Sequence, residues 1–102
     1  MNTGISELIK KTLGNLYCEK IVLFGSRARG DFKGRSNYDI LIMIKPNLSI
    51  KEKMQLTAQL RKNLAKMGID ADIIIKSDEE INYYKDKIGS VVRSALKEGV
   101  AL

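Results

Sequence analysis

Two short stretches decide the fold that this sequence predicts: Gly25-Ser26-Arg27-Ala28-Arg29-Gly30 and, after five further residues, Ser36-Asn37-Tyr38-Asp39-Ile40-Leu41. The first is a loop or a single helical turn, and it directly follows a β-rich run that predicts a buried strand over Lys20–Phe24. The second opens a strand predicted over Asn37–Ile44, in which successive side chains alternate between the two faces. The sequence therefore predicts a glycine turn beside a strand whose first polar side chains share a face.

The segments on either side predict helices and one further strand. Apolar residues at helical spacing indicate a helix over residues 5–16, with Thr3 as its N-cap. A capping box at 49–52 starts a helix near Ile50, and Gly68 stops it. A third strand is expected over Asp70–Lys76. A second capping box at 77–80 opens the last helix, which Gly89 kinks or divides and Gly99 ends.

This order of elements predicts the class of fold. The 102 residues fit one domain, spanning residues 1–102. We expect an α+β fold of two layers, with a small mixed sheet of about three strands flanked by helices. Residues 31–35 are expected to form a surface loop. The longest apolar runs are too short to cross a membrane, and the N-terminal residues do not resemble a signal peptide.

Composition excludes several kinds of chemistry. The chain has no histidine, which rules out a Ser-His-Asp triad and argues against a typical zinc site. Its single cysteine, Cys18, allows no intrachain disulfide, and we expect a cytoplasmic protein in which this residue packs in the core. The net charge of +6 suits an anionic partner, which charge alone leaves open between nucleotide, nucleic acid and an acidic protein surface.

Carboxylates on neighbouring strands predict a magnesium site. Asp39 lies in an apolar strand, where an aspartate is unfavourable without a partner. A further acid from the third strand can complete a pocket for hard cations, and Asp72 is the first candidate, with Asp70 as the second. Two Mg²⁺ ions in such a pocket would stabilise a displacement at phosphorus. Alternatively, Asp39 caps a helix or pairs with Arg29, and Asp72 has only a strand-start or surface role.

The glycine turn predicts a phosphate-binding loop. Gly25 permits a tight turn that a Cβ would obstruct, and Ser26 brings a hydroxyl and backbone N–H groups to the end of the strand. Arg29 or Arg27 adds positive charge for a triphosphate, unless these arginines are ordinary solvated residues. The loop matches neither a Walker A motif nor a dinucleotide fingerprint.

Together these motifs resemble the minimal nucleotidyltransferases of the DNA polymerase β-like superfamily. The resemblance rests on Gly25-Ser26, ten intervening residues, Asn37-Tyr38-Asp39, and the later acid in Asp70-Ala71-Asp72. It implies a palm-like sheet, ATP or another NTP as substrate, and two Mg²⁺ ions held at positions 37, 39 and 72. It implies that Gly25, Ser26 and Arg29 bind the triphosphate, while Asp72 also activates the attacking hydroxyl.

The resemblance also implies a partner. Stand-alone domains of this kind are often antitoxins paired with an all-helical HEPN ribonuclease, and some transfer AMP to a tyrosine of the toxin. A nucleic-acid partner is less favoured, since the sequence has no RNA-binding aromatic motif or zinc finger. Oligomeric state stays open.

One position departs from the family pattern. Asn37 stands where the motif has an aspartate, and an amide brings one neutral oxygen in place of a charged carboxylate. Two hypotheses follow. The chain is a nucleotidyltransferase with activity weakened by Asn37, or it is a catalytically inactive domain of the same fold that sequesters a partner toxin.

Overall fold

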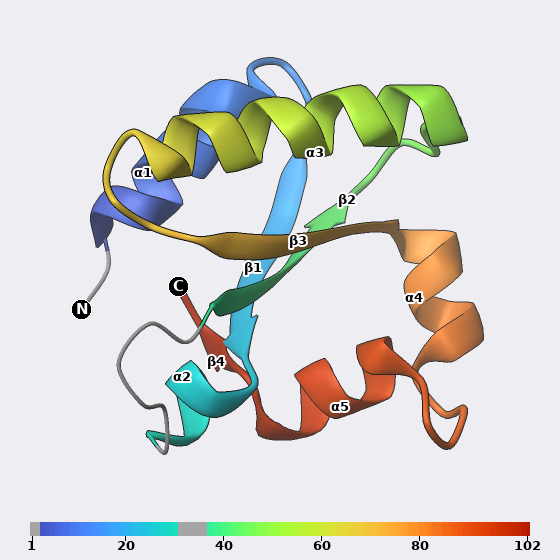
Figure 1. Cartoon of the computed structure of the whole chain (residues 1–102). Coiled ribbons are helices and arrows are strands. Elements are labelled where there is room, and N and C mark those ends of the chain that lie inside the picture. Colours follow the sequence, from blue (N-terminus) through green and yellow to red (C-terminus); the bar gives the residue numbers. More distant parts are fainter. Residues whose placement is uncertain (1–2, 31–36) are drawn as a thin grey trace.

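The computed structural model describes residues 3–30 and 37–102 (Figure 1). Within these residues the elements follow in this order: α1 (Thr3–Leu13), β1 (Cys18–Phe24), α2 (Ser26–Arg29), β2 (Tyr38–Ile44), α3 (Ile50–Ala65), β3 (Ala71–Ser77), α4 (Asp78–Tyr84), α5 (Val91–Glu98) and β4 (Val100–Ala101). The predicted α+β class, with helices flanking a small mixed sheet, is confirmed. The loop expected over residues 31–35 lies outside the described residues.

The strands form one sheet in the order β3-β2-β1-β4. β1 pairs antiparallel with β2 and with β4, whereas β2 and β3 run parallel. The prediction did not include β4, a strand of two residues that pairs with the outer edge of β1. A strand this short leaves no period-2 pattern for sequence analysis to detect.

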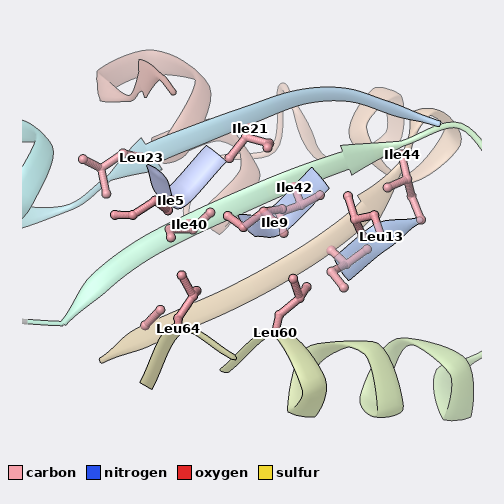
Figure 2. Close-up of a cluster of buried hydrophobic side chains, with 12 residues drawn as sticks. Ile5, Ile9, Leu13, Ile21, Leu23, Ile40, Ile42, Ile44, Leu60 and Leu64 are labelled. Carbon is pink, nitrogen blue, oxygen red and sulfur yellow. The ribbon is translucent and has the colours of Figure 1, made fainter. Parts of the chain in front are cut away.

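Helices lie on both faces of this sheet, as Figure 1 shows for α1 and α3 on one side and α5 on the other. The larger buried cluster joins α1 and α3 to one face of the strands, and Figure 2 shows these side chains meeting over Ile40 and Ile42. The smaller cluster, on the opposite face, groups Ala95 of α5 with Val22 of β1 and with Leu41 and Met43 of β2. The alternation predicted for β2 is therefore present.

Local capping chemistry fixes where two helices begin. At α3 the Ser49 side chain accepts a hydrogen bond from the Glu52 N–H, while the Glu52 carboxylate accepts one from the Ser49 N–H. Ser77 and Glu80 form the same reciprocal pair at α4. Both predicted capping boxes are confirmed, and each satisfies backbone donors that a helix leaves unpaired at its start.

Other boundaries differ from the prediction by a few residues. α1 ends at Leu13, because Gly14 takes a positive φ of 62° that ends helical hydrogen bonding. The last helical segment is two helices, α4 and α5. Gly89 has a φ of 84° between them, and the Ser90 side chain accepts from the Arg93 N–H to cap α5. Gly99 ends α5 as expected.

The core makes a direct prediction about stability. Leu60 of α3 is fully buried in the larger cluster, so Leu60→Ala leaves a cavity and should lower the free energy of unfolding by about 2–5 kcal/mol. Met54 lies on the same helix with 67% of its surface exposed. Met54→Ala should stay within about 0.5 kcal/mol of the unaltered chain. Urea unfolding measures both, and equal losses for the two variants would contradict this assignment of the core.

Candidate active site

The glycine turn meets the second strand at one end of the sheet. Phe24 is the last residue of β1 and pairs with Asp39, the second residue of β2. The next residue, Gly25, adopts φ 74° and ψ −158°, a conformation essentially confined to glycine. A Cβ at Gly25 would collide with Oδ2 of Asp39. The turn therefore lies directly against the Asp39 carboxylate, and only a residue without a side chain fits there.

The two predicted carboxylates are neighbours. Asp39 pairs in register with Asp72 of the parallel strand β3. Residues in register on adjacent strands present their side chains to the same face, with strand axes about 4.8 Å apart. This is the face that Leu41 and Ile74 share farther along the strands. The parallel pairing thus brings together two acids that are distant in the sequence.

The electrostatics of Asp39 reflect this arrangement. Partial burial raises the pKa of the Asp39 carboxyl above its ordinary value, and the negative charge of Asp72 raises it further. The positive charge of Arg29 acts in the opposite direction and lowers it. A partly buried carboxylate beside a second negative charge is a site that a cation would stabilise.

Asn37 lies at the same end of the sheet, one residue before β2 begins. Its side-chain Nδ2 donates a hydrogen bond to Oδ2 of Asp72, with 3.1 Å between the two atoms. The structure thus places all three residues of the predicted metal set close together. It also gives Asn37 a contact that an aspartate could not make, because a carboxylate has no N–H to donate.

The predicted triphosphate residues lie in α2 and the turn before it. Of the two predicted alternatives, a loop or a single helical turn, the structure has the helical turn, and Ser26 is its first residue. The guanidinium of Arg27 stacks 4.4 Å from the centre of the Tyr38 ring. Arg29 Nη1 lies 3.1 Å from Oε1 of Glu98, and both side chains are partly exposed. Arg29 thus forms an ion pair with Glu98 and also acts electrostatically on Asp39, in line with the alternative that paired these two residues.

Sequence analysis missed Glu98 as a neighbour of the site. It lies at the end of α5, and 69 positions separate it from Arg29. No local pattern signals such a pair, because the contact exists only once α5 packs against β1. Asp70, the second candidate acid, is exposed and lies just before β3, where its carbonyl accepts a hydrogen bond from the Tyr38 N–H. Across residues 3–30 and 37–102, no three His, Cys, Asp or Glu side chains converge as a metal-binding group.

A small mixed sheet with paired carboxylates beside a glycine turn defines the class of nucleotidyltransferase-like α+β domains. A family model described as polymerase beta, nucleotidyltransferase matches residues 7–98. The chain belongs to this family.

Two curated proteins of Methanocaldococcus jannaschii, each named "Putative protein adenylyltransferase", resemble the chain. One is 34% identical over 71 residues, which cover 70% of this chain and 63% of the relative. The other is 37% identical over 84 residues, covering 82% and 77%. The chain thus matches less than two thirds of the first relative.

Solved structures share the fold at lower identity. A toxin–antitoxin structure with AMP-PNP has a TM-score of 0.64 at 19% identity, covering 99% of this chain and 72% of the other. A nucleotidyltransferase-like protein of Sulfolobus solfataricus scores 0.61 at 24% identity, covering 96% and 72%. A structure of the tri-AMPylated Shewanella oneidensis HEPN toxin with its MNT antitoxin scores 0.56 at 16% identity, covering 96% and 65%.

In the described part of the chain, every helix is too short or too polar to cross a membrane.

The fit between Gly25 and Asp39 makes a prediction. Gly25→Ala should lower the free energy of unfolding by about 1–3 kcal/mol from backbone strain, and displacement of Asp39 adds to this loss. Gly30→Ala is the matched control, because Gly30 also has positive φ (81°) but faces open space. Its cost should be smaller, about 1 kcal/mol. Denaturant unfolding of both variants measures the difference, and a smaller loss at position 25 would exclude the close contact.

The raised pKa of Asp39 makes a prediction about pH. As pH rises from 3.8, the ordinary value, the unfolded chain loses the Asp39 proton before the folded chain does. The folded state therefore loses stability until pH passes the folded pKa, and the full penalty remains at neutral pH. Asp39→Asn removes the penalty and should raise the melting temperature at about pH 7, with no gain at about pH 3.

Asp86→Asn is the control for this experiment, because it also removes one exposed carboxylate but belongs to the segment between α4 and α5, which carries none of the site residues. Its melting temperature should follow that of the unaltered chain at both pH values. A destabilised Asp39→Asn variant at neutral pH would show that Asp39 is stabilised by its surroundings, contrary to the raised pKa.

Proposed function

We propose that this chain is a metal-dependent nucleotidyltransferase that moves a nucleoside monophosphate from a triphosphate to a hydroxyl on a partner protein. The observation that carries the proposal is the register of Asp39 with Asp72, which sets two carboxylates side by side next to the Gly25 turn. The names of the two archaeal relatives favour AMP, taken from ATP, as the transferred group.

The side chains at this end of the sheet suit Mg²⁺, which prefers oxygen ligands and carboxylates above all. Asp39 and Asp72 would hold the ion, and the amide oxygen of Asn37 would be a neutral third ligand. Burial of Asp39 and the neighbouring charge of Asp72, which together raise the Asp39 pKa, favour this assignment, since a cation between the carboxylates would offset both effects. When bound, Mg²⁺ would offset the charge of the triphosphate and of the departing pyrophosphate.

Residues of the site would also bind the triphosphate and accept the proton of the attacking hydroxyl. The Ser26 hydroxyl and the backbone at the start of α2 would bind the triphosphate, with Arg29 adding positive charge. The acceptor hydroxyl oxygen attacks the α-phosphorus, and the bond between that phosphorus and the pyrophosphate oxygen breaks. Asp72 accepts the hydroxyl proton, so one phosphodiester bond replaces one phosphoanhydride bond. This chemistry needs no histidine, and the chain has none.

We further propose that the protein partner is a toxin of the HEPN type, with this chain as its antitoxin. A toxin–antitoxin structure and a structure of a HEPN toxin in complex with its MNT antitoxin both match this fold. The exposed apolar side chains at the α4–α5 end, including Tyr83, Ile88 and Val91, offer a surface that a partner protein would cover.

The hydrogen bond from Asn37 to Asp72 favours a second function for the same fold. It engages one carboxylate oxygen of Asp72 at 3.1 Å, and the site lacks one of the family's three negative charges. Both effects weaken cation binding. In this second proposal the chain binds and sequesters its partner without transferring a nucleotide.

The proposal predicts that Asn37→Asp raises the rate of transfer by about 10²-fold or more, because it restores a charge at a site where charge develops in the transition state. The assay uses labelled ATP, Mg²⁺ and the protein encoded by the neighbouring gene, with label on that protein as the readout. Asp72→Asn in the Asn37→Asp background should abolish transfer.

Controls separate folding from chemistry in this assay. Mg²⁺ with ATP should raise the melting temperature of the Asn37→Asp form. Glu7→Gln, which removes an exposed carboxylate of α1 outside the proposed partner surface, should label its partner at the unaltered rate. Stable complex formation without label from either form would support sequestration. The absence of both label and complex would overturn both proposed functions.

A further inference from the structure

β3 forms an edge of the sheet with open backbone groups. The sheet order ends at β3, and no described strand pairs with its outer side. The Tyr38 N–H donates to the Asp70 carbonyl, and Tyr38 is in register with Ala71. In a parallel ladder this pattern turns the backbone groups of residues 70, 72, 74 and 76 toward β2. The N–H and C=O groups of Ala71, Ile73 and Ile75 therefore face outward.

A groove runs along this edge between α3 and β3. Two adjoining hollows of about 470 Å³ and 520 Å³ share Ala58 and Arg61 in their walls. The first hollow reaches Asn37, so the groove ends at the candidate active site. On the helix side of the groove, the small side chains of Ala58 and Ala65 leave space open. A chain lying along β3 would thus have room beside α3.

The groove carries positive charge at the end near the active site. In the second hollow, Lys53 and Lys76 are already paired with Glu80, at 2.6 Å and 3.8 Å. In the first hollow, Arg61 and Lys62 are exposed, and neither forms an ion pair within the described residues. Asp70 also lines this hollow, so Arg61 and Lys62 leave it with one net positive charge for negatively charged groups of a ligand.

Strand geometry connects this edge to the chemistry. A strand added to β3 would lie about 4.8 Å from it, and a residue opposite Asp72 would point to the same face as Asp72. Asp72 is already in register with Asp39, which contacts the Gly25 turn. Four groups would then form a row across the sheet. The added side chain is the acceptor, Asp72 is the base, Asp39 is a metal ligand, and the Gly25 turn binds the triphosphate.

We propose that the open edge of β3 binds an extended, acidic segment of the acceptor protein as an additional β-strand, which places a hydroxyl of that segment beside Asp72. The binding mode follows from the backbone groups and the charges of the groove. Only the transfer step rests on the proposed function.

The experiment uses a short synthetic peptide in which glutamate alternates with threonine about a central tyrosine. In an added strand its glutamates face α3 and its tyrosine faces the side of Asp72. Binding is measured by calorimetry with the unaltered chain and no nucleotide. Hydrogen exchange of backbone amides is followed by NMR. The peptide should bind and slow the exchange of the Ala71, Ile73 and Ile75 amides, because each gains a hydrogen-bond acceptor.

Charge variants test the cationic end of the groove. The double variant Arg61→Glu, Lys62→Glu should weaken binding about tenfold or more, since each exposed charge contact contributes up to about 1 kcal/mol. Lys51→Glu, Lys66→Glu is the matched control: it changes the net charge equally on exposed positions of the same segment outside the groove. This control should retain the affinity of the unaltered chain. A peptide with lysine in place of glutamate should not bind.

Several results would overturn the docking proposal. They are the absence of glutamate-peptide binding, equal affinity for the lysine peptide, and unchanged exchange at the three outward amides in the saturated complex. Transfer is scored separately, as AMP label on the peptide tyrosine with the Asn37→Asp chain, ATP and Mg²⁺. Binding with amide protection but no label would support the docked strand and count against the proposed transferase.

Discussion

The parallel pairing of β2 with β3 is the constraint on which the candidate site depends. Parallel strands cannot be joined by a tight turn. The chain must therefore return to the same end of the sheet between β2 and β3, and α3 forms this crossover connection. α3 also buries Leu60 and Leu64 in the larger core cluster. The hydrophobic effect that holds α3 against the sheet therefore also sets the register of β2 and β3. A slip of one residue would send Asp72 to the face opposite Asp39.

The pairing of β2 with β3 places two carboxylates, Asp39 and Asp72, at the candidate site, where their proximity destabilises the folded chain. Asp39 is partly buried and lies beside the negative charge of Asp72, and its raised pKa reflects first the burial and then the repulsion. The apolar core around the rest of β2 supplies the stability that tolerates it. Stored destabilisation of this kind is typical of sites whose charges are complemented only when a ligand binds. The amide of Asn37 relieves part of it, because it donates a hydrogen bond to Asp72.

The sequence predicted those parts of the fold that local rules determine. Alternation along residues 38–44 predicted the two faces of β2, and the Ser-x-x-Glu patterns predicted the starts of α3 and α4. Gly89 was recognised as a point of division because glycine is unfavourable within a helix. The spacing of the motifs also led to Asp39, Asp72 and Asn37, which the fold brings together, while their roles remain predictions.

What sequence analysis missed depends on tertiary contacts. β4 exists because the end of α5 brings two residues alongside β1, and two residues carry no periodic signal. The partnership of Arg29 with Glu98 arises from the same packing. The groove beside β3 likewise depends on how α3 packs against an edge strand, which local sequence patterns do not reveal. Arg61 and Lys62 are therefore indistinguishable, in the sequence, from other charges on an exposed helix surface.

The contact between Gly25 and Asp39 makes these two positions epistatic. A side chain at position 25 is excluded partly by its backbone conformation and partly by the carboxylate it would strike. Replacing Asp39 with a smaller residue removes the second obstacle and leaves the first, so the effects of changes at the two sites cannot simply add. Among descendants that abandon nucleotide chemistry, loss of the aspartate is accordingly the easier first step. After that loss a substitution at position 25 meets only the backbone strain, which gives the decay of such a site a preferred order.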